Sequence, residues 1–229
     1  MRYAVYYAPE RKTDLWRFGC RVLGRDPETG EAVAPLMPDG IDAGTWTEWT
    51  ASPRRYGFHA TLKAPFALAE DRAEAELDLA VADFAAGRTT FRLPRLKVAA
   101  LGRFVALIPA EDAKELELLA ADCVRAFDHF RAPLTAEALA KRLAAPLSPS
   151  EHAHLRRWGY PYVFQDFQFH MTLTGALPED AVEPVARQLH ALYEREMGAE
   201  PMKVESVAVF MEPKDGATFR LVKRFRFKG

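Results

Sequence analysis

The sequence is poor in cysteine, in net charge and in long apolar runs. Its 229 residues include two cysteines, Cys20 and Cys123, in neither a metal-ligand nor a redox spacing. The prediction is two reduced thiols, with one disulfide between them as the alternative. The formal net charge of −1 excludes a global basic field that would recruit long nucleic acid, although a local basic pocket is compatible with it.

No stretch of the sequence is apolar over the length that a bilayer requires. The opening segment, residues 2–8, alternates like a strand and lacks the apolar region of a signal peptide. We therefore predict a cytoplasmic protein with no membrane partner. Hydrophobic residues make up 49% of the chain, which is enough to build a sizeable core and argues against disorder.

Hydrophobic periodicity predicts strands and helices along the whole chain. The expected helices cover residues 14–23, 71–86, 110–130, 135–143, 148–158 and 178–197. The expected strands cover residues 2–8, 56–63, 95–101, 103–108, 166–174, 202–211 and 217–227. Residues 25–53 have the composition of a long loop, and such a loop in a compact chain often covers a binding site.

Two similar tetrapeptides stand out, His59-Ala60-Thr61-Leu62 and His170-Met171-Thr172-Leu173, each preceded by phenylalanine. Side chains of a strand alternate between its two faces. In each copy the histidine and threonine therefore share one face, and the three apolar residues share the other. Two copies in matching surroundings suggest that each half of the chain supplies one histidine to a common site.

The similarity extends beyond the tetrapeptides. Residues 67–71 (ALAED) and 176–180 (ALPED) follow the two motifs, and each leads into a helix and then two strands. This is a strand–helix–strand–strand unit used twice, an internal duplication. We expect one bilobal domain over residues 1–229. Its first lobe covers about 54–109, a helical insert about 110–158 and the second lobe about 160–229, with strand 2–8 joining the sheets.

The paired residues suit phosphodiester chemistry. A neutral imidazole can take a proton from an attacking water while a protonated one donates to the leaving oxygen, because the ordinary pKa of histidine is about 6.5. The predicted catalytic residues are His59, Thr61, His170 and Thr172, with the threonine hydroxyls donating to phosphate oxygens. Which histidine is the acid stays open. No metal or other cofactor is needed.

Further polar residues are candidates for substrate binding. The same-face rule adds Lys63 on the first strand and Gln168 and Thr174 on the second. Arg55 and Tyr56 precede the first motif and Tyr160 precedes the second, where they could contact a phosphate, sugar or base. For each of them a solvated or structural role is the alternative. His152 and His154 are two apart on a predicted helix, do not share a face and are not expected to bind zinc.

The paired motifs resemble the H-x-T/S motifs of the two-histidine (2H, or LigT-like) phosphoesterase superfamily. More narrowly, residues 54–66 (RRYGFHATLKAPF) and 2–9 (RYAVYYAP) resemble a bacterial branch linked to phosphonate metabolism, DUF1045. The resemblance implies a bilobal α+β fold with antiparallel sheets around a central groove. It also implies metal-independent cleavage of cyclic or linear phosphodiesters at His59, Thr61, His170 and Thr172.

The substrate follows from the resemblance alone. Some RNA-processing relatives carry a basic residue soon after the second motif, whereas Thr174-Gly175-Ala176 follow it in this chain. That departure favours a small substrate over an RNA end. In phosphonate breakdown, carbon–phosphorus lyase yields a ribose 1,2-cyclic phosphate bearing a 5-phosphate, which must be opened. The alternatives are an RNA-end 2′,3′-cyclic phosphodiesterase or RNA ligase, and a non-catalytic module that binds a phosphorylated metabolite.

Overall fold

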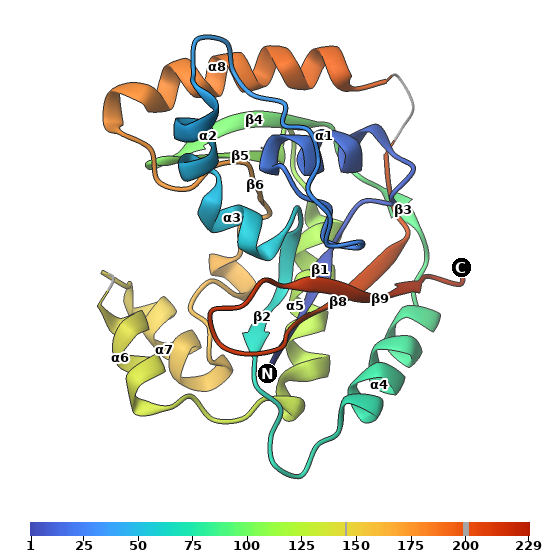
Figure 1. Ribbon diagram of the computed structural model, residues 1–229. Helices are drawn as coiled ribbons and strands as arrows, with labels where there is room; N and C mark the ends of the chain where they lie inside the picture. The colour runs from blue at the N-terminus through green and yellow to red at the C-terminus, as the bar shows by residue number, and fades with distance from the viewer. Residues whose placement is uncertain (145, 199–201) are drawn as a thin grey trace.

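The computed structural model describes residues 1–144, 146–198 and 202–229 (Figure 1). Its helices are α1 (Asp14–Leu23), α2 (Ala43–Trp49), α3 (Ala51–Tyr56), α4 (Glu74–Ala86), α5 (Lys114–Phe127), α6 (Ala136–Leu143), α7 (Pro149–Trp158) and α8 (Glu179–Glu196). Its strands are β1 (Arg2–Tyr7), β2 (Ala60–Phe66), β3 (Phe91–Arg92), β4 (Leu96–Leu101), β5 (Phe104–Pro109), β6 (Met171–Thr172), β7 (Lys203–Val204), β8 (Ser206–Glu212) and β9 (Arg220–Arg226). The predicted α+β class is confirmed.

Seven strands form one antiparallel sheet in the order β4-β5-β6-β2-β1-β8-β9. The two motif strands, β2 and β6, are neighbours at its centre. The hairpin that follows β2 in the sequence, β4-β5, pairs with β6, whereas the hairpin that follows β6, β8-β9, pairs through β1 with β2. The two halves of the sequence are thus interleaved in the sheet. The short strands β3 and β7 also pair across the halves.

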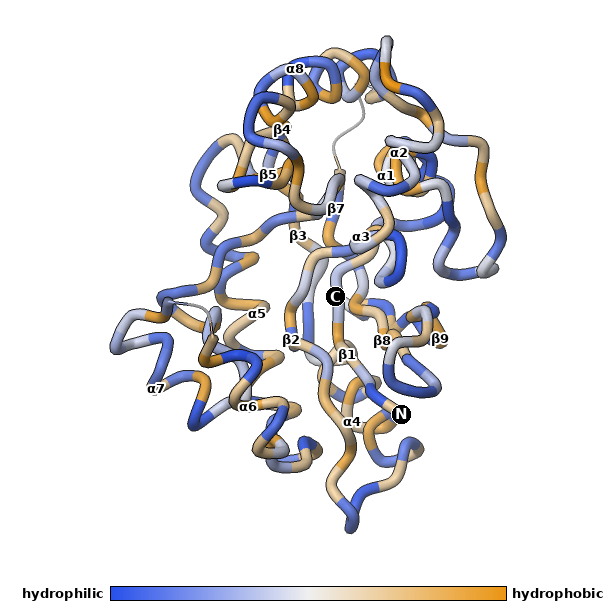
Figure 2. The backbone as a smooth tube through the Cα atoms, turned by 60° about the vertical axis from the view of Figure 1, so that its left-hand side comes forward, coloured by the Kyte–Doolittle hydropathy of each residue, from blue (hydrophilic) through white to orange (hydrophobic). Residues whose placement is uncertain are grey.

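Alternation along β1 divides the interior into two cores. Tyr3, Val5 and Tyr7 pack in the larger core, whereas Ala4 and Tyr6 pack in a smaller one on the other face. Helices α4, α5 and α8 contribute apolar side chains to the larger core. Figure 2 shows the resulting alternation of apolar and polar residues along α8. The smaller core lies on the face that carries the motif polar residues.

The predicted core face of both motifs is confirmed. The apolar residues of the two tetrapeptides and the phenylalanine before each are at most 4% exposed and lie in the larger core: Phe58, Ala60, Leu62, Phe169, Met171 and Leu173. Cys20 and Cys123 are both buried and free, as the prediction of reduced thiols stated. No helix in the described parts of the chain is long and apolar enough to cross a membrane.

Several predicted boundaries are wrong. The expected loop 25–53 contains α2 and leads into α3, which carries on to Tyr56, so that the first motif strand begins four residues later than predicted. Asp42 caps α2 by accepting from the amides of Gly44 and Thr45, a helix start hidden in a polar stretch. The second motif strand shrinks to Met171–Thr172 because Phe164–Asp166 form a 3₁₀ turn ahead of it.

Candidate active site

The two His-x-Thr segments meet on adjacent antiparallel strands. Ala60 of β2 pairs with Met171 of β6. Extending this register by one residue on either side puts Thr61 opposite His170 and His59 opposite Thr172. The two histidines are then diagonal neighbours, which lie about 7–8 Å apart, with a somewhat shorter separation between their Cβ atoms. Each imidazole therefore has the threonine of the other motif directly across from it.

Both imidazole rings are held in the same way. His59 Nδ1 lies 2.8 Å from the carbonyl oxygen of Gly57, and His170 Nδ1 lies 2.8 Å from the carbonyl oxygen of Gln168. A carbonyl oxygen only accepts, so Nδ1 carries the hydrogen in both rings and Nε2 is left for chemistry. Gly57 has a φ of +82° and a Cβ there would lie 2.5 Å from Pro27, so this carbonyl position requires glycine.

His59 sits in a drier environment than an ordinary histidine. Its ring stacks on that of Tyr6, with centroids 3.7 Å apart, and its Nε2 lies 3.3 Å from Thr61 Oγ1. Burial lowers the pKa of His59 to about 4; the Gly57 carbonyl opposes this shift, and repulsion from a charged His170 adds to it. The neutral ring can accept the Thr61 hydroxyl proton at Nε2. His59 is therefore neutral at neutral pH.

The lowered pKa predicts a pH-dependent stability. Below pH 6.5 the unfolded chain protonates His59, whereas the folded protein does so only near pH 4. The lowered pKa of His59 therefore contributes to the free energy of unfolding. That contribution is fully present above pH 6.5, and about 2–3 kcal/mol of it is lost on acidification to pH 4. Denaturant unfolding gives the free energies of unfolding of wild type and His59→Gln across this pH range. The difference between these two free energies should shrink or reverse as pH falls. A difference that does not change with pH contradicts the prediction.

Two cavities adjoin at the paired motifs. One, of about 440 Å³, is lined by His59, Thr61 and Thr172. The other, of about 480 Å³, is lined by Thr61 and His170. Both cavities share the side chains of Thr61, Ala64, Phe104 and Tyr160. The two histidines thus line neighbouring cavities that share four side chains, and we refer to the two cavities together as the groove.

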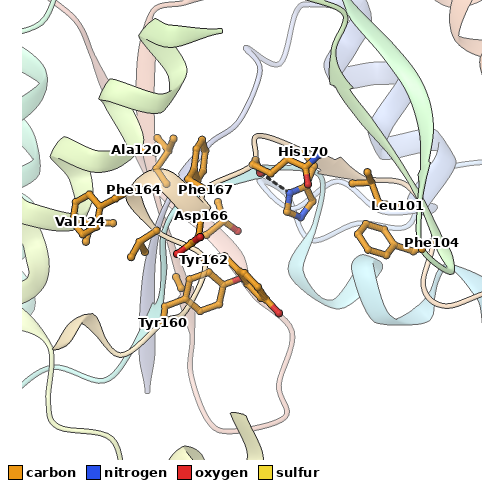
Figure 3. A pocket seen from close by; sticks show the side chains of 16 residues that line it. Leu101, Phe104, Ala120, Val124, Tyr160, Tyr162, Phe164, Asp166, Phe167 and His170 are labelled. Carbon is orange, nitrogen blue, oxygen red and sulfur yellow. Dashed lines mark hydrogen bonds between the residues drawn. The ribbon is translucent and has the colours of Figure 1, made fainter. Parts of the chain in front are cut away.

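The cavity beside His170 is apolar and aromatic. Figure 3 shows the His170 ring between Phe104 and Leu101 on one side and Tyr160 and Tyr162 on the other. Phe164 and Phe167, from the 3₁₀ turn and the residue after it, complete this wall. Burial raises the pKa of Tyr160 to about 12, so its hydroxyl stays a neutral hydrogen-bond donor. Tyr160 lines both cavities.

Lys63 does not lie on the same face as His59 and Thr61. Along β2, Thr61 pairs with Tyr6 but Lys63 pairs with Val5, so a β-bulge at Leu62 inserts one residue between them. A bulge reverses the alternation beyond it. Lys63 consequently points to the other side of the sheet, where it is 3% exposed and forms an ion pair with Asp128 at 2.6 Å. The predicted substrate-facing position of Lys63 is wrong.

The remaining predicted contacts divide into two groups. Tyr56 lines the cavity beside His59 and stacks on Phe219, with centroids 5.0 Å apart. Gln168 lines the aromatic cavity with an exposed side chain. Arg55 instead bonds to Glu212 and to the carbonyl of Ala217 and does not line either cavity.

Thr174 borders the cavity beside His59 but is fully buried. Its hydroxyl accepts the amide hydrogen of Val105 at 3.0 Å and donates to the carbonyl of Gly175 at 2.9 Å. Both of these bonds serve the backbone where β6 ends beside β5. The hydroxyl is therefore occupied by the fold, and the structure gives Thr174 a positioning role.

Sequence reasoning missed two arginines at the site, Arg2 and Arg142. Both line the cavity that contains His59, from the start of β1 and the last turn of α6. Neither belongs to a His-x-Thr motif, and α6 was assigned only to an insert. The alternation of β1 is a signal that could have found the first, since Arg2 shares a face with Tyr6, which stacks on His59.

Metal ligands do not gather at this site. Among the described residues, no group of three or more histidine, cysteine, aspartate or glutamate side chains is arranged to hold a metal ion. His154 lies 3.0 Å from Asp166, and the described residues add no third ligand to this pair.

Comparison with known proteins places the chain in a family. Residues 61–220, which contain the second His-x-Thr motif, match the model of a protein family of unknown function, DUF1045. This chain belongs to the DUF1045 family. The resemblance to that branch, inferred from the motif residues, is confirmed.

Curated relatives of this DUF1045 protein carry a kinase name. It is 37% identical over its whole length to a protein of Janthinobacterium sp. (strain Marseille) and 39% identical over 97% of its length to one of Laribacter hongkongensis (strain HLHK9), both named ribose 1,5-bisphosphate phosphokinase PhnN. The matched region is 51% of each relative. The chain thus spans about half the length of the curated relatives it matches.

Among solved structures, one described as a phosphoesterase superposes on the DUF1045 protein with a TM-score of 0.41 at 17% identity, covering 100% of this chain and 98% of the other. E. coli LigT complexed with 3′-AMP gives a TM-score of 0.40 at 15% identity with the same coverage. Superpositions and identities this low establish neither a common fold nor a common activity.

Proposed function

We propose that this DUF1045 protein is a metal-independent cyclic phosphodiesterase that acts on a small ribosyl cyclic phosphate. The observation that carries the proposal is the pairing of β2 with β6, which brings two identically held imidazoles and two threonine hydroxyls to one groove. Convergent titratable groups with fixed tautomers are what acid–base catalysis requires.

The geometry supports distinct roles for the two histidines. His59, neutral because of its burial, takes a proton at Nε2 from a water whose oxygen attacks phosphorus. The bond from phosphorus to one ester oxygen breaks, and that oxygen receives a proton from Nε2 of a protonated His170. Thr61 and Thr172 donate to the non-bridging oxygens as negative charge builds up. The product is a phosphomonoester with a free hydroxyl.

Phosphonate metabolism is the proposed context. The relatives' name refers to a ribosyl bisphosphate, the class of molecule that opening a phosphorylated ribosyl cyclic phosphate would produce. The kinase reaction itself has no counterpart among this chain's motifs, because its sequence contains no Gly-Lys pair and hence no P-loop. Its two-histidine site suits a reaction that opens a ribosyl cyclic phosphate and so supplies a ribosyl phosphate.

A second candidate is a nucleotide 2′,3′-cyclic phosphodiesterase acting on RNA ends. The observation in its favour is the aromatic cavity beside His170, where Tyr160, Tyr162 and Phe104 could stack on a base. Comparing kcat/KM for adenosine 2′,3′-cyclic phosphate and for a ribose cyclic phosphate without a base distinguishes the two. A strong preference for the nucleotide favours the second candidate.

The pH dependence of turnover in EDTA tests the proposal. Wild type is expected to keep its activity in EDTA and to give a bell-shaped profile of kcat/KM against pH. The acid limb reflects protonation of the base His59, with a pKa of about 4 in the free protein, and the alkaline limb reflects loss of the donor proton. Loss of activity in EDTA, or a profile flat from pH 5 to 9, contradicts the mechanism.

A further inference from the structure

The cavity beside His59 is lined by two arginines, Arg2 and Arg142, that take no part in the proposed proton transfers. Arg2 forms ion pairs with Glu212 at 2.5 Å and with the exposed Asp215 at 3.1 Å. Glu212 is fully buried and is shared with Arg55. Arg2 is therefore paired, whereas Arg142 is the arginine of this cavity that has no carboxylate partner among the described residues. An unpaired guanidinium group at a cavity wall favours binding of an anion.

In the part of the chain that the structure describes, Arg142 is the unpaired cation of this cavity. Within residues 1–144, 146–198 and 202–229, no carboxylate lies within 4 Å of its guanidinium. Its partners are the carbonyl of Gly159 and the face of the Tyr160 ring, whose centroid is 5.8 Å away. Burial lowers the pKa of Arg142, and the nearby charge of Arg2 acts in the same direction. A half-buried cation without a counter-ion is costly unless a ligand supplies the charge.

From this arrangement, we propose that Arg2 and Arg142 bind a second anionic group of the substrate, a phosphomonoester separate from the cyclic phosphate. This inference rests on the proposed function, since it assigns the second group to the molecule held between the histidines. The two arginines come from the start of β1 and the end of α6, and Tyr56 and Tyr160 line the same cavity and can donate hydroxyl hydrogens. Guanidinium is the side-chain group best suited to phosphate oxygens.

The segment between β5 and β6, which includes the helical insert, supplies part of this subsite. Arg142 and Tyr160 both belong to the segment between β5 and β6 that includes α6 and α7. Figure 1 shows α6 and α7 as a separate layer beside the central strands. An insert that brings a cation to the groove selects a substrate with a charge at a fixed distance from its reacting phosphorus.

Paired substrates test the subsite. Adenosine 2′,3′-cyclic phosphate with and without a 5′-phosphate differ only in the second anion. Wild type should prefer the 5′-phosphorylated compound by about 10- to 100-fold in kcat/KM. Arg142→Met should bring that ratio close to one, mainly by raising KM for the phosphorylated compound, and Arg142→Lys should restore part of it. The matched control is Arg156→Met, an exposed arginine of α7 outside both cavities, which should keep the wild-type ratio.

Calorimetric binding of ribose 5-phosphate separates this inference from the proposed function. If wild type binds it and Arg142→Met does not, the subsite is supported even when neither cyclic nucleotide is turned over. If both nucleotides are turned over at equal kcat/KM by wild type, or the ratio is unchanged in Arg142→Met, the subsite is overturned while the phosphodiesterase activity stands. Circular dichroism of each variant verifies that it is folded.

Discussion

Replacing either His59 or His170 with alanine is expected to lower kcat for cyclic phosphodiester hydrolysis by about 10²- to 10⁴-fold. In the proposed mechanism the two imidazoles act on the same phosphorus, and neither threonine can replace a titrating group. The double variant should lose little more than the worse single variant, because residues that act as a unit are not additive. Steady-state rates at neutral pH in EDTA measure the effect.

The control for this experiment is His190→Ala, which removes an exposed histidine from α8, away from both cavities. It should leave kcat within twofold of wild type. Full activity in either His59→Ala or His170→Ala would rule out the paired-histidine mechanism. Thr61→Val and Thr172→Val should give smaller losses, because each removes one donor to the phosphate and leaves proton transfer in place.

Asp128→Asn is expected to lower the free energy of unfolding by about 3–5 kcal/mol. Lys63 is 3% exposed, and its ammonium group lies 2.6 Å from Asp128. Burial lowers the pKa of Lys63, and the Asp128 carboxylate opposes that shift. Burial acts to raise the pKa of Asp128, but hydrogen bonds from Arg131 and Lys63 outweigh it and leave the pKa lowered. Neutralising the carboxylate leaves a buried cation without its partner.

Chemical denaturation measures this loss, and Asp122→Asn is the matched control. Asp122 pairs with Arg88 where both side chains are about one-third exposed, so its removal should cost less than about 1 kcal/mol. An Asp128→Asn protein as stable as the control would show that the pair is not energetically important. Lys63→Met should also lower the free energy of unfolding. It should leave KM within twofold of wild type, because Lys63 faces away from the groove.

Much of the fold could be predicted because its signals are local. Helix α1 agrees with the prediction at both ends, since Thr13 caps its start and Gly24, with a φ of +71°, ends it. Helix α7 ends where predicted and begins one residue later than predicted, because Ser148 is its cap and forms a capping box with Glu151. The loop 25–53 was harder, because short helices such as α2 carry too few residues for a periodic pattern.

For the site, the duplicated motif was sufficient to select His59, Thr61, His170 and Thr172 as candidates and to assign their shared face. That face depends only on alternation along a few residues, which the sequence shows directly. Lys63 shows where the rule stops, since one bulge at Leu62 reversed the face of the residues after it. The bulge depends on how β2 pairs with β1, and the residues of the motif do not predict it.

The sequence by itself determined that two equivalent histidine–threonine pairs exist, which apolar residues hold them in the core, and that the DUF1045 family is the one to which the chain belongs. Only the tertiary structure decided that β2 and β6 are adjacent, that each half's hairpin pairs beside the other half's motif, and that Arg2 and Arg142 reach the same groove. The physical reason is the separation along the chain over which each interaction acts. Alternation and capping act over a few residues, whereas strand order, the lowered pKa of His59 and the charge of the cavity arise from contacts between segments far apart in the chain.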